Sequence, residues 1–397
     1  MPVVNPEILT WARDTAGLSV EDAASKLGFR ATQKRSGVAR LQALEAGDEA
    51  PSRSVLVKMA SQYRRPLLTF YLPAPPLKGK RGHDFRTLPE DHSLASEALV
   101  DALIREIQAR QSLIRSALED EEETPTLNFI GSAKRSDGTD FLVKSIRTTL
   151  GLSPTSIRES ESAEKAFSDL RERAESIGIF ILIIGNLGSH HTSIGVESFR
   201  GFALADSIAP FVVINDQDSK AAWSFTLLHE LAHLWLGETG ISGERADQDT
   251  EKFCNDVASE LLLPRTELRN VSLPHDPDIP LLETHINEIA TAYNVSRALV
   301  AYRLYRDQRI DQDSWQNLTR RFREHWIRER ETHRQRSRET DTGGPSYYVV
   351  KRHRLGQGLM RTAARLMQDG ALSTYKAGQV LGVKPTQVQR LFADRSA

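Results

Sequence analysis

One stretch, residues 223–236 (WSFTLLHELAHLWL), constrains the fold more than any other part of the sequence. Almost every position in it is apolar, which predicts a helix that is buried on all sides. His229 and His233 are four residues apart, so a helix places both imidazoles on one face, where they can share a metal ion. Glu230 is rotated about 100° from His229. Its carboxylate would miss the metal but reach a water bound to it, as a general base requires.

The polar groups of this helix need a partner. The alternative to a metal site is a pair of core histidines with a glutamate at a helix surface. Two imidazoles and a carboxylate in an otherwise apolar helix are costly when no ligand satisfies them. The pattern therefore predicts Zn²⁺ bound by His229 and His233, with Glu230 as the catalytic base.

A second helix carries the candidate third ligand. We expect Thr250 to cap a helix over residues 251–263, which Pro264 stops. Glu251 would then complete the metal site, since two histidines, a carboxylate and an open fourth position form the hydrolytic arrangement. Asn255, one turn further on, is expected to orient one histidine as a hydrogen-bond acceptor. The competing third ligands are Glu260, Glu238 and Glu244.

A small β-sheet is predicted directly before the metal helix. Residues 178–185, 198–205 and 209–215 have the β-branched and apolar content of short strands. In zinc peptidases an edge strand beside the site holds an extended peptide by backbone pairing. Residues 211–215 are the candidate for that strand, and the alternative is a strand that only builds core.

The first 76 residues predict a separate helical domain. Ser19 starts a helix that ends at Gly28, and further helices are expected over residues 38–46 and after the break at residues 50–52. The pattern WARDTAGLSVEDAASKLG…LEAGDEAPSRSVLVKMASQY resembles the helix-turn-helix domains of Xre-type repressors. The resemblance implies DNA binding, and the candidate contacts are Lys34, Arg35 and Arg40. The alternative is a helix-turn-helix fold that binds a protein.

Composition limits the remaining possibilities. The 397 residues carry 52 Lys+Arg and 53 Asp+Glu, so nucleic-acid binding has to come from local clusters. A single cysteine, Cys254, excludes an intrachain disulfide and favours a reducing compartment, and its place in an apolar helix predicts a core residue. The first residues lack a signal-peptide pattern, and the apolar run 177–184 is too short to cross a bilayer. We therefore expect a soluble, cytoplasmic protein without membrane contact.

The segment FTLLHELAHLWLG followed by EKFCNDVASELLLP is similar to the ImmA/IrrE family of metallopeptidases. The family pattern joins His-Glu-x-x-His to a downstream Glu-x-x-(Cys/Ala)-Asn-x-x-Ala-x-x-Leu-Leu-x-Pro. The matching positions are His229, Glu230, His233, Glu251, Cys254, Asn255, Ala258 and Pro264. One departure is Phe253, where many members carry a second acid, so Glu251 is the only acid at this point of the pattern.

The resemblance implies a cytoplasmic zinc endopeptidase that cuts a repressor, often an Xre-type partner, in phage, mobile-element or stress circuits. A different class of function is a DNA-binding regulator or antitoxin-like protein whose zinc domain senses metal or a ligand without proteolysis. A structural zinc site would not need Glu230 and is usually closed by four protein ligands, which favours the peptidase. Tyr293, His275 and His285 are possible oxyanion helpers outside the predicted site.

The predicted fold class is α+β, mostly α-helical. Its parts are a helix-turn-helix domain over residues 1–76, a connector with a long helix over 77–130, and a zincin-like metallopeptidase domain over 131–312. A charged helix and linker follow over 313–346, and a small helical module fills 347–397. The last module reads as helix, Gly-Val turn, helix, and its basic residues permit either DNA or a protein partner. The sequence does not indicate an oligomeric state.

Overall fold

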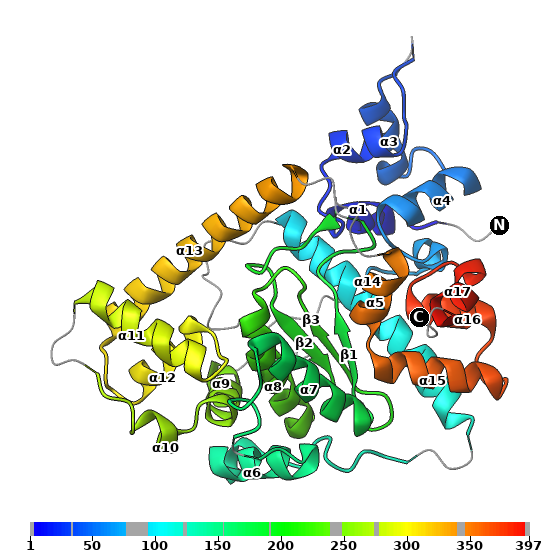
Figure 1. Ribbon diagram of the computed structural model, residues 1–397. Helices are drawn as coiled ribbons and strands as arrows, with labels where there is room; N and C mark the ends of the chain where they lie inside the picture. Colours follow the sequence, from blue (N-terminus) through cyan, green and yellow to red (C-terminus); the bar gives the residue numbers. More distant parts are fainter. Residues whose placement is uncertain are drawn as a thin grey trace. The chain divides into compact units, whose positions relative to one another are not determined.

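The computed structural model describes residues 4–32, 35–76, 94–121, 125–153, 155–189, 192–238, 248–273, 278–339 and 346–393. The chain divides into two compact units. The first comprises Met1–Gly79, Thr87–Ile107 and Asn186–Phe199, and the second comprises Lys80–Arg86, Gln108–Gly185 and Arg200–Ala397. The described residues are mostly helical with one small sheet, which confirms the predicted fold class (Figure 1).

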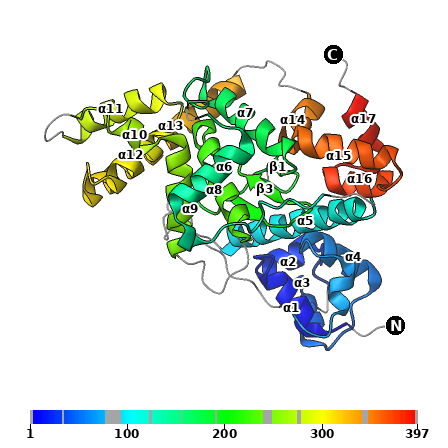
Figure 2. The same ribbon diagram turned by 90° about the horizontal axis from the view of Figure 1, so that it is seen from below.

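The N-terminal part of the first unit is a cluster of four short helices (Figure 2). They are α1 (Pro6–Asp14), α2 (Val20–Lys26), α3 (Gly37–Ala46) and α4 (Arg53–Gln62), followed by the 3₁₀ helix η1 (Leu67–Tyr71). Serine side chains cap the backbone at the start of α2, α3 and α4, which explains why the sequence locates these helices well. Ile8, Leu41 and Met59 lie in the core of this cluster.

The sheet has three strands, β1 (Phe180–Ile183), β2 (Gly201–Leu204) and β3 (Phe211–Ile214), in the order β1-β3-β2. β3 pairs parallel with β1 and antiparallel with β2. The predicted sheet is therefore present, but the prediction that residues 211–215 form an edge strand is wrong. β3 lies in the centre, where its backbone groups are used by its two neighbours, so it cannot pair with an added peptide.

The sheet lies in the second unit together with a series of helices. They are α6 (Thr139–Leu150), α7 (Ala163–Ser176), α8 (Lys220–Leu236), α9 (Gln248–Leu262), α10 (Arg265–Leu268), α11 (Ile279–Ala292), α12 (Arg297–Arg306) and α13 (Gln312–Glu339). α8 packs against α7, α9 and strands β2 and β3, while α11, α12 and α13 pack on one another. The long helix α5 (Leu94–Glu119) contributes residues to both units. None of the helices in the described residues has the length and apolar character needed to cross a membrane.

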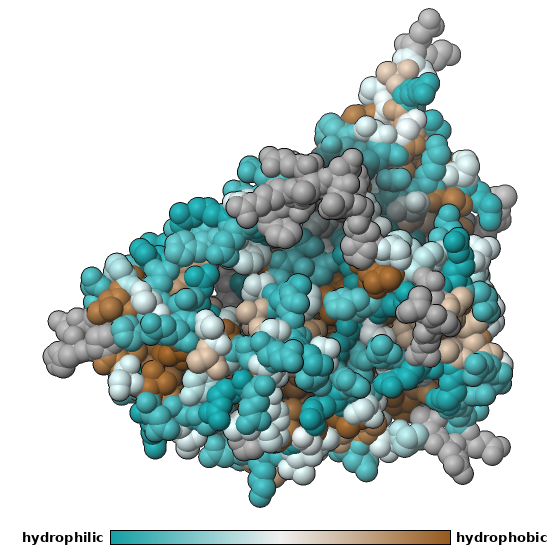
Figure 3. All heavy atoms as spheres, in the orientation of Figure 1, coloured by the Kyte–Doolittle hydropathy of each residue, from teal (hydrophilic) through white to brown (hydrophobic). Residues whose placement is uncertain are grey.

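α13 is the charged helix that the sequence predicts. Its sequence, QDSWQNLTRRFREHWIRERETHRQRSRE, is rich in arginine and glutamate, and the surface over it is hydrophilic (Figure 3). Its apolar contacts lie near its start, where Leu318 and Phe322 join the core of the second unit. A mostly solvated helix is therefore the correct description of this segment.

The C-terminal helices belong to the second unit as well. They are α14 (Tyr347–Leu355), α15 (Gln357–Gln368), α16 (Thr374–Leu381), the 3₁₀ helix η5 (Pro385–Gln387) and α17 (Val388–Ala393). α14 and α15 contact β1, and α15 also contacts α7.

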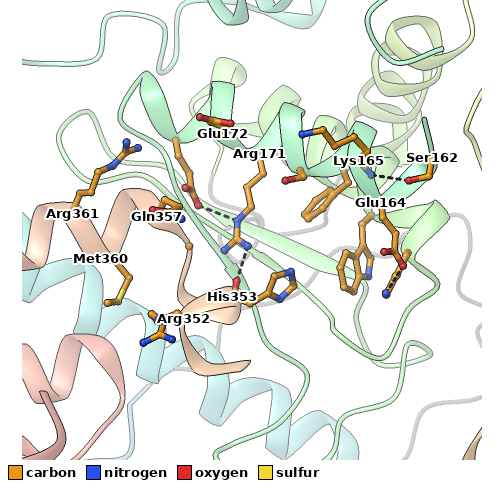
Figure 4. A pocket seen from close by; sticks show the side chains of 16 residues that line it. Ser162, Glu164, Lys165, Arg171, Glu172, Arg352, His353, Gln357, Met360 and Arg361 are labelled. Atoms are coloured by element: carbon orange, nitrogen blue, oxygen red, sulfur yellow. Dashed lines mark hydrogen bonds and ion pairs between the residues drawn. The ribbon is translucent and has the colours of Figure 1, made fainter. Parts of the chain in front are cut away.

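A buried ion pair on α7, Arg171 with Glu175, holds the corner between α14 and α15. Arg171 donates from Nη1 to the carbonyl of His353 over 2.7 Å (Figure 4). Glu175 Oε2 accepts from the Gly358 N–H over 2.8 Å. Arg171 Nε is 3.0 Å from Glu175 Oε1, and both side chains are less than a tenth exposed. One ion pair thus serves the C-terminal carbonyls of α14 and the N-terminus of α15, with the charge signs that the two helix dipoles favour. We call this arrangement the Arg171–Glu175 clasp.

Candidate metal centre

The helix that carries the His-Glu-x-x-His pattern is buried along nearly its whole length. Every residue of α8 from Ala222 to Trp235 is buried. Burying each large apolar side chain of this helix contributes about 1.5–3 kcal/mol, so the sequence allows no other place for it. Gly237 ends the helix in the left-handed conformation. The carbonyls of Leu234 and Trp235 accept hydrogen bonds from the backbone of residues 131 and 133, which satisfies the helix end.

α9 crosses beside α8 and brings the third residue of the candidate site. The helix begins at Gln248, so Thr250 lies inside its first turn and is not the cap that the sequence predicted. The outer face of α9 is fixed to α12 by two ion pairs. Asp256 accepts from Arg306 Nε over 2.9 Å and from the Tyr302 hydroxyl over 3.0 Å, and Arg303 Nη2 donates to Glu260 over 2.6 Å. These contacts hold the face of α9 that carries Glu251 against α8.

The side chains of His229, His233 and Glu251 converge. The two Nε2 atoms are 3.1 Å apart, Glu251 Oε2 is 3.2 Å from His229 Nε2, and Glu251 Oε1 is 3.4 Å from His233 Nε2. A tetrahedral zinc ion with bonds of about 2.0–2.1 Å sets its ligand atoms roughly 3.3 Å apart. The three side chains therefore have the donor types and the spacing that fit zinc.

Burial and charge at this cluster favour a bound cation. His229 and His233 are 3% and 4% exposed. Burial is the strongest influence on the pKa of His233 and lowers it, but Cys254, Glu238 and Glu251 raise that pKa well above its usual value. Burial raises the pKa of Glu251, whereas its hydrogen bonds to both histidines and their charges lower it, with a net decrease. Positive charge between these groups is thus strongly stabilised, and a divalent ion would supply it in place of protons.

Glu230 lies one residue after His229 and is itself buried. Its carboxylate packs against the first residue of β2. A Cβ at Gly201 would lie 2.9 Å from Glu230 Oε1, 2.5 Å from Thr226 Cγ2 and 3.1 Å from the Val213 carbonyl oxygen. Only glycine fits this position without displacing one of these neighbours. Gly201 is a site residue that sequence reasoning missed, because no spacing in the sequence links it to Glu230.

Asn255 does not make the hydrogen bond to a histidine that its predicted role requires. Asn255 is 2% exposed, and its Oδ1 atom has no hydrogen-bond partner among the described residues. The Nδ1 atoms of His229 and His233 also lack hydrogen-bond partners in the part of the chain that is described. The expected hydrogen bond from a histidine to Asn255 is therefore not formed.

Cys254 is fully buried in the core, and burial raises the pKa of its thiol, so it is a neutral core residue here.

The competing residues lie in other surroundings. Glu260 forms an ion pair with Arg303. Glu238 is half exposed and lies 3.8 Å from Nδ1 of His233, whereas the converging ring nitrogens are the Nε2 atoms. Glu244 and His275 lie outside the described residues. The Tyr293 hydroxyl is 3.2 Å from Glu267 Oε2, and His285 contacts the carbonyl of Leu281 in its own helix. Only Glu251 meets the two histidines among the acids whose positions are described.

The candidate DNA contacts of the N-terminal helices already have intramolecular partners. Arg35 forms a 2.5 Å ion pair with Glu49, in which both side chains are more than 40% exposed. The guanidinium of Arg40 lies 4.6 Å from the centre of the Phe29 ring. Lys34 lies outside the described residues. Exposed pairs of this kind are weak and do not prevent phosphate contacts, so DNA binding by these residues stays a prediction.

A pocket of about 910 Å³ lies elsewhere in the second unit (Figure 4). It is lined by α7, the start of α8 and the corner between α14 and α15, including Arg171 of the clasp. Its lining includes Trp223 of α8 but none of His229, His233 or Glu251. The pocket is thus separate from the candidate metal centre.

The helix pair and its converging side chains define a domain of the metallopeptidase type. Residues 187–305 match the family model Peptidase_M78, described as the IrrE N-terminal-like domain. This segment is a domain of that peptidase family, which confirms the resemblance to ImmA/IrrE. The match contains α8 and α9 and does not include the N-terminal helices. Searches of curated proteins and of solved structures found no similar protein.

The contact between Gly201 and Glu230 gives a testable expectation. In Gly201→Ala the new methyl group would push against Glu230 and the rigid backbone of β3. We expect cleavage to fall by roughly 10–100-fold, because small misplacements of a catalytic group are costly, while metal content stays unchanged. Enzyme kinetics and metal analysis of the purified variant measure both quantities.

The control uses the nearest neighbour of that methyl group. Thr226→Ser removes Cγ2 and keeps the hydroxyl that bonds to the Ala222 carbonyl. Alone it should cleave like the wild type, and combined with Gly201→Ala it should restore part of the lost activity. A Gly201→Ala protein with full activity would show that Glu230 is not confined in this way.

Proposed function

We propose that this protein is a zinc-dependent endopeptidase that cleaves a partner protein, an Xre-type transcriptional repressor, in a phage, mobile-element or stress-response circuit. The match to a peptidase family supports the class of activity. The observation that carries the proposal is the convergence of the two Nε2 atoms and the Glu251 carboxylate. A repressor is proposed because the chain resembles ImmA/IrrE proteins and carries an Xre-like N-terminal segment.

His229, His233 and Glu251 would hold the zinc ion. When bound, zinc polarises a peptide carbonyl and lowers the pKa of a water molecule to about 7. Glu230 would take a proton from the attacking water and pass it to the leaving amine, as a general base and then a general acid. The buried walls of α8 and β2 keep bulk water away from the Glu230 carboxylate, which strengthens its interaction with charge that develops nearby.

The N-terminal helices, residues 5–76, are proposed to position the enzyme by binding DNA or the substrate repressor. Their resemblance to Xre-type domains supports this role. Cleavage would then be carried out by the second unit, which contains His229, Glu230, His233 and Glu251.

The test uses an Xre-type repressor encoded beside the gene as the substrate. Purified protein with zinc should shorten the repressor at one site, which mass spectrometry identifies. Treatment with a chelator should abolish cleavage, and one equivalent of zinc should restore it. A repressor that stays intact with the zinc-loaded protein would reject this substrate, and cleavage that survives complete metal removal would reject the zinc mechanism.

A further inference from the structure

The C-terminal helices concentrate positive charge. Residues 346–393 contain eight lysines and arginines and one acid, Asp369, for a net charge of +7, although the whole chain has a net charge of −1. The basic residues are Lys351, Arg352, Arg354, Arg361, Arg365, Lys376, Lys384 and Arg390. A local cluster of this sign is the electrostatic footprint of a surface that binds polyanions.

Two of these cations contact acids elsewhere in the second unit. Arg354 pairs with Asp216 over 2.5 Å, and Arg365 pairs with Glu121 over 2.6 Å. These pairs attach the module to the rest of its unit. Lys376 and Lys384 are exposed, and no carboxylate among the described residues lies within ion-pair distance of them. The positive charge of these two lysines is therefore available to a ligand.

The last elements are a helix, a short turn and a second helical segment. α16 ends at Gly382, which is left-handed with φ of 60°, and η5 begins three residues later and continues into α17. A Cβ at Gly378 would lie 2.9 Å from the Val383 carbonyl oxygen and 3.2 Å from the Pro385 nitrogen. A side chain at position 378 of α16 would contact the backbone of the turn too closely, so this position requires glycine. In DNA-binding helix-turn-helix motifs, a short turn joins the first helix to the one that enters the major groove.

The buried and exposed faces of this pair are well separated. The core positions are Ala377, Val380, Leu381, Val388 and Leu391. On the second helical segment the exposed polar and charged side chains are Lys384, Thr386, Gln389 and Arg390. Lysine, arginine and glutamine are the side chains that contact phosphates and the base edges of the major groove. The guanidinium of Arg390 lies 5.4 Å from the centre of the Tyr348 ring, which limits its motion while it stays exposed.

We propose that residues 373–393 bind duplex DNA, with the segment from Lys384 to Arg390 in the major groove and Lys376 on the phosphate backbone. Charge complementarity favours DNA over a protein partner, because every charged side chain of this segment is an exposed cation, and Tyr375 is its one exposed large hydrophobic side chain. This function is independent of the proposed peptidase activity. It would place the enzyme on DNA through its second unit.

The experiment measures the binding of the full-length protein to a fluorescent random-sequence duplex of about 30 base pairs, by anisotropy, over a range of salt concentrations. Each phosphate contact contributes about 0.9 to the slope of log affinity against log salt concentration. The variant Lys376→Ala/Lys384→Ala should bind at least about 10-fold more weakly at low salt, with a slope reduced by roughly one for the phosphate contact of Lys376. Both lysines are exposed, and circular dichroism checks the fold.

Two matched variants make the result specific. Lys134→Ala/Lys144→Ala removes the same charge from exposed positions elsewhere in the second unit and should bind DNA like the wild type. Arg35→Ala/Arg40→Ala tests the N-terminal helices and should leave the C-terminal contribution to the slope in place. Wild-type affinity and slope in Lys376→Ala/Lys384→Ala would overturn the proposal, as would a full-length protein with no salt-sensitive DNA binding. Equal affinity for single-stranded RNA would also reject a major-groove mode.

Discussion

Glu230→Gln is expected to abolish nearly all cleavage while the protein keeps its zinc and its fold. Glutamine preserves the shape of the side chain and can still hydrogen-bond, but it cannot accept a proton. The expected decrease in kcat is at least the roughly 10²–10⁴-fold contributed by a general base. Because Glu230 packs against Gly201 in a buried position, a side chain of the same size should leave the neighbouring strand undisturbed. The measurement follows the length of the repressor over time with equal amounts of both proteins.

The same variant separates an enzyme from a sensor. A regulator that uses zinc only for structure or metal sensing needs no proton acceptor, so its Glu230→Gln form would behave like the wild type in every cellular readout. Metal analysis and the melting temperature serve as controls, and both should be unchanged. Equal processing of the repressor by the two proteins would end the enzyme interpretation.

His229→Ala is expected to lose zinc altogether, and Glu251→Gln to bind it far more weakly. Loss of an outer hydrogen-bond partner already costs about 10–100-fold in metal affinity, and these residues would be direct ligands. Added zinc should raise the melting temperature of the wild type, because a ligand that binds only the folded state stabilises it. It should not raise that of His229→Ala. The readouts are metal content after dialysis and thermal melts with and without zinc.

The controls for this result are the two rival glutamates. Glu260→Gln and Glu238→Gln should keep one zinc per chain, because Glu260 is bonded to Arg303 and Glu238 approaches only the Nδ1 side of His233. Glu260→Gln is expected to lower stability, since it leaves the buried Arg303 with a neutral partner. If Glu260→Gln lost zinc while Glu251→Gln retained it, the third ligand would have to be reassigned.

The helices could be predicted closely from the sequence because their signals are local. α8 is apolar around its whole circumference, and serine caps mark the starts of α2, α3 and α4. The strands could be located but not ordered. β1 and β3 are buried at every position and β2 at three of four, so no face alternates to indicate which strand lies at the edge. Their pairing is set by contacts between segments far apart in the chain.

For the candidate site too, local features could be predicted from the sequence and contacts between helices could not. The spacing of His229 and His233 follows from helix geometry, whereas the choice between Glu251 and Glu260 depends on how α9 is rotated against α8. That rotation is fixed by Arg303 and Arg306 of α12, whose partners on α9 cannot be assigned from spacing alone. The hydrogen bond expected for Asn255 is not formed for a related reason. The sequence places Asn255 on the same helix as Glu251, but it does not determine whether the Asn255 oxygen lies within reach of a histidine N–H.

The Arg171–Glu175 clasp limits which C-terminal segments recombination can join to this chain. The family match ends at residue 305, yet a buried ion pair before the match needs backbone groups of His353 and Gly358 after it. A different C-terminal module placed on the same face without those groups would leave both buried charges with fewer hydrogen bonds, at a cost of roughly 1.5–3 kcal/mol for each one lost. The C-terminal helices are therefore not a freely interchangeable cassette. Recombination could replace them only together with Arg171 and Glu175, so the two segments should be inherited as one.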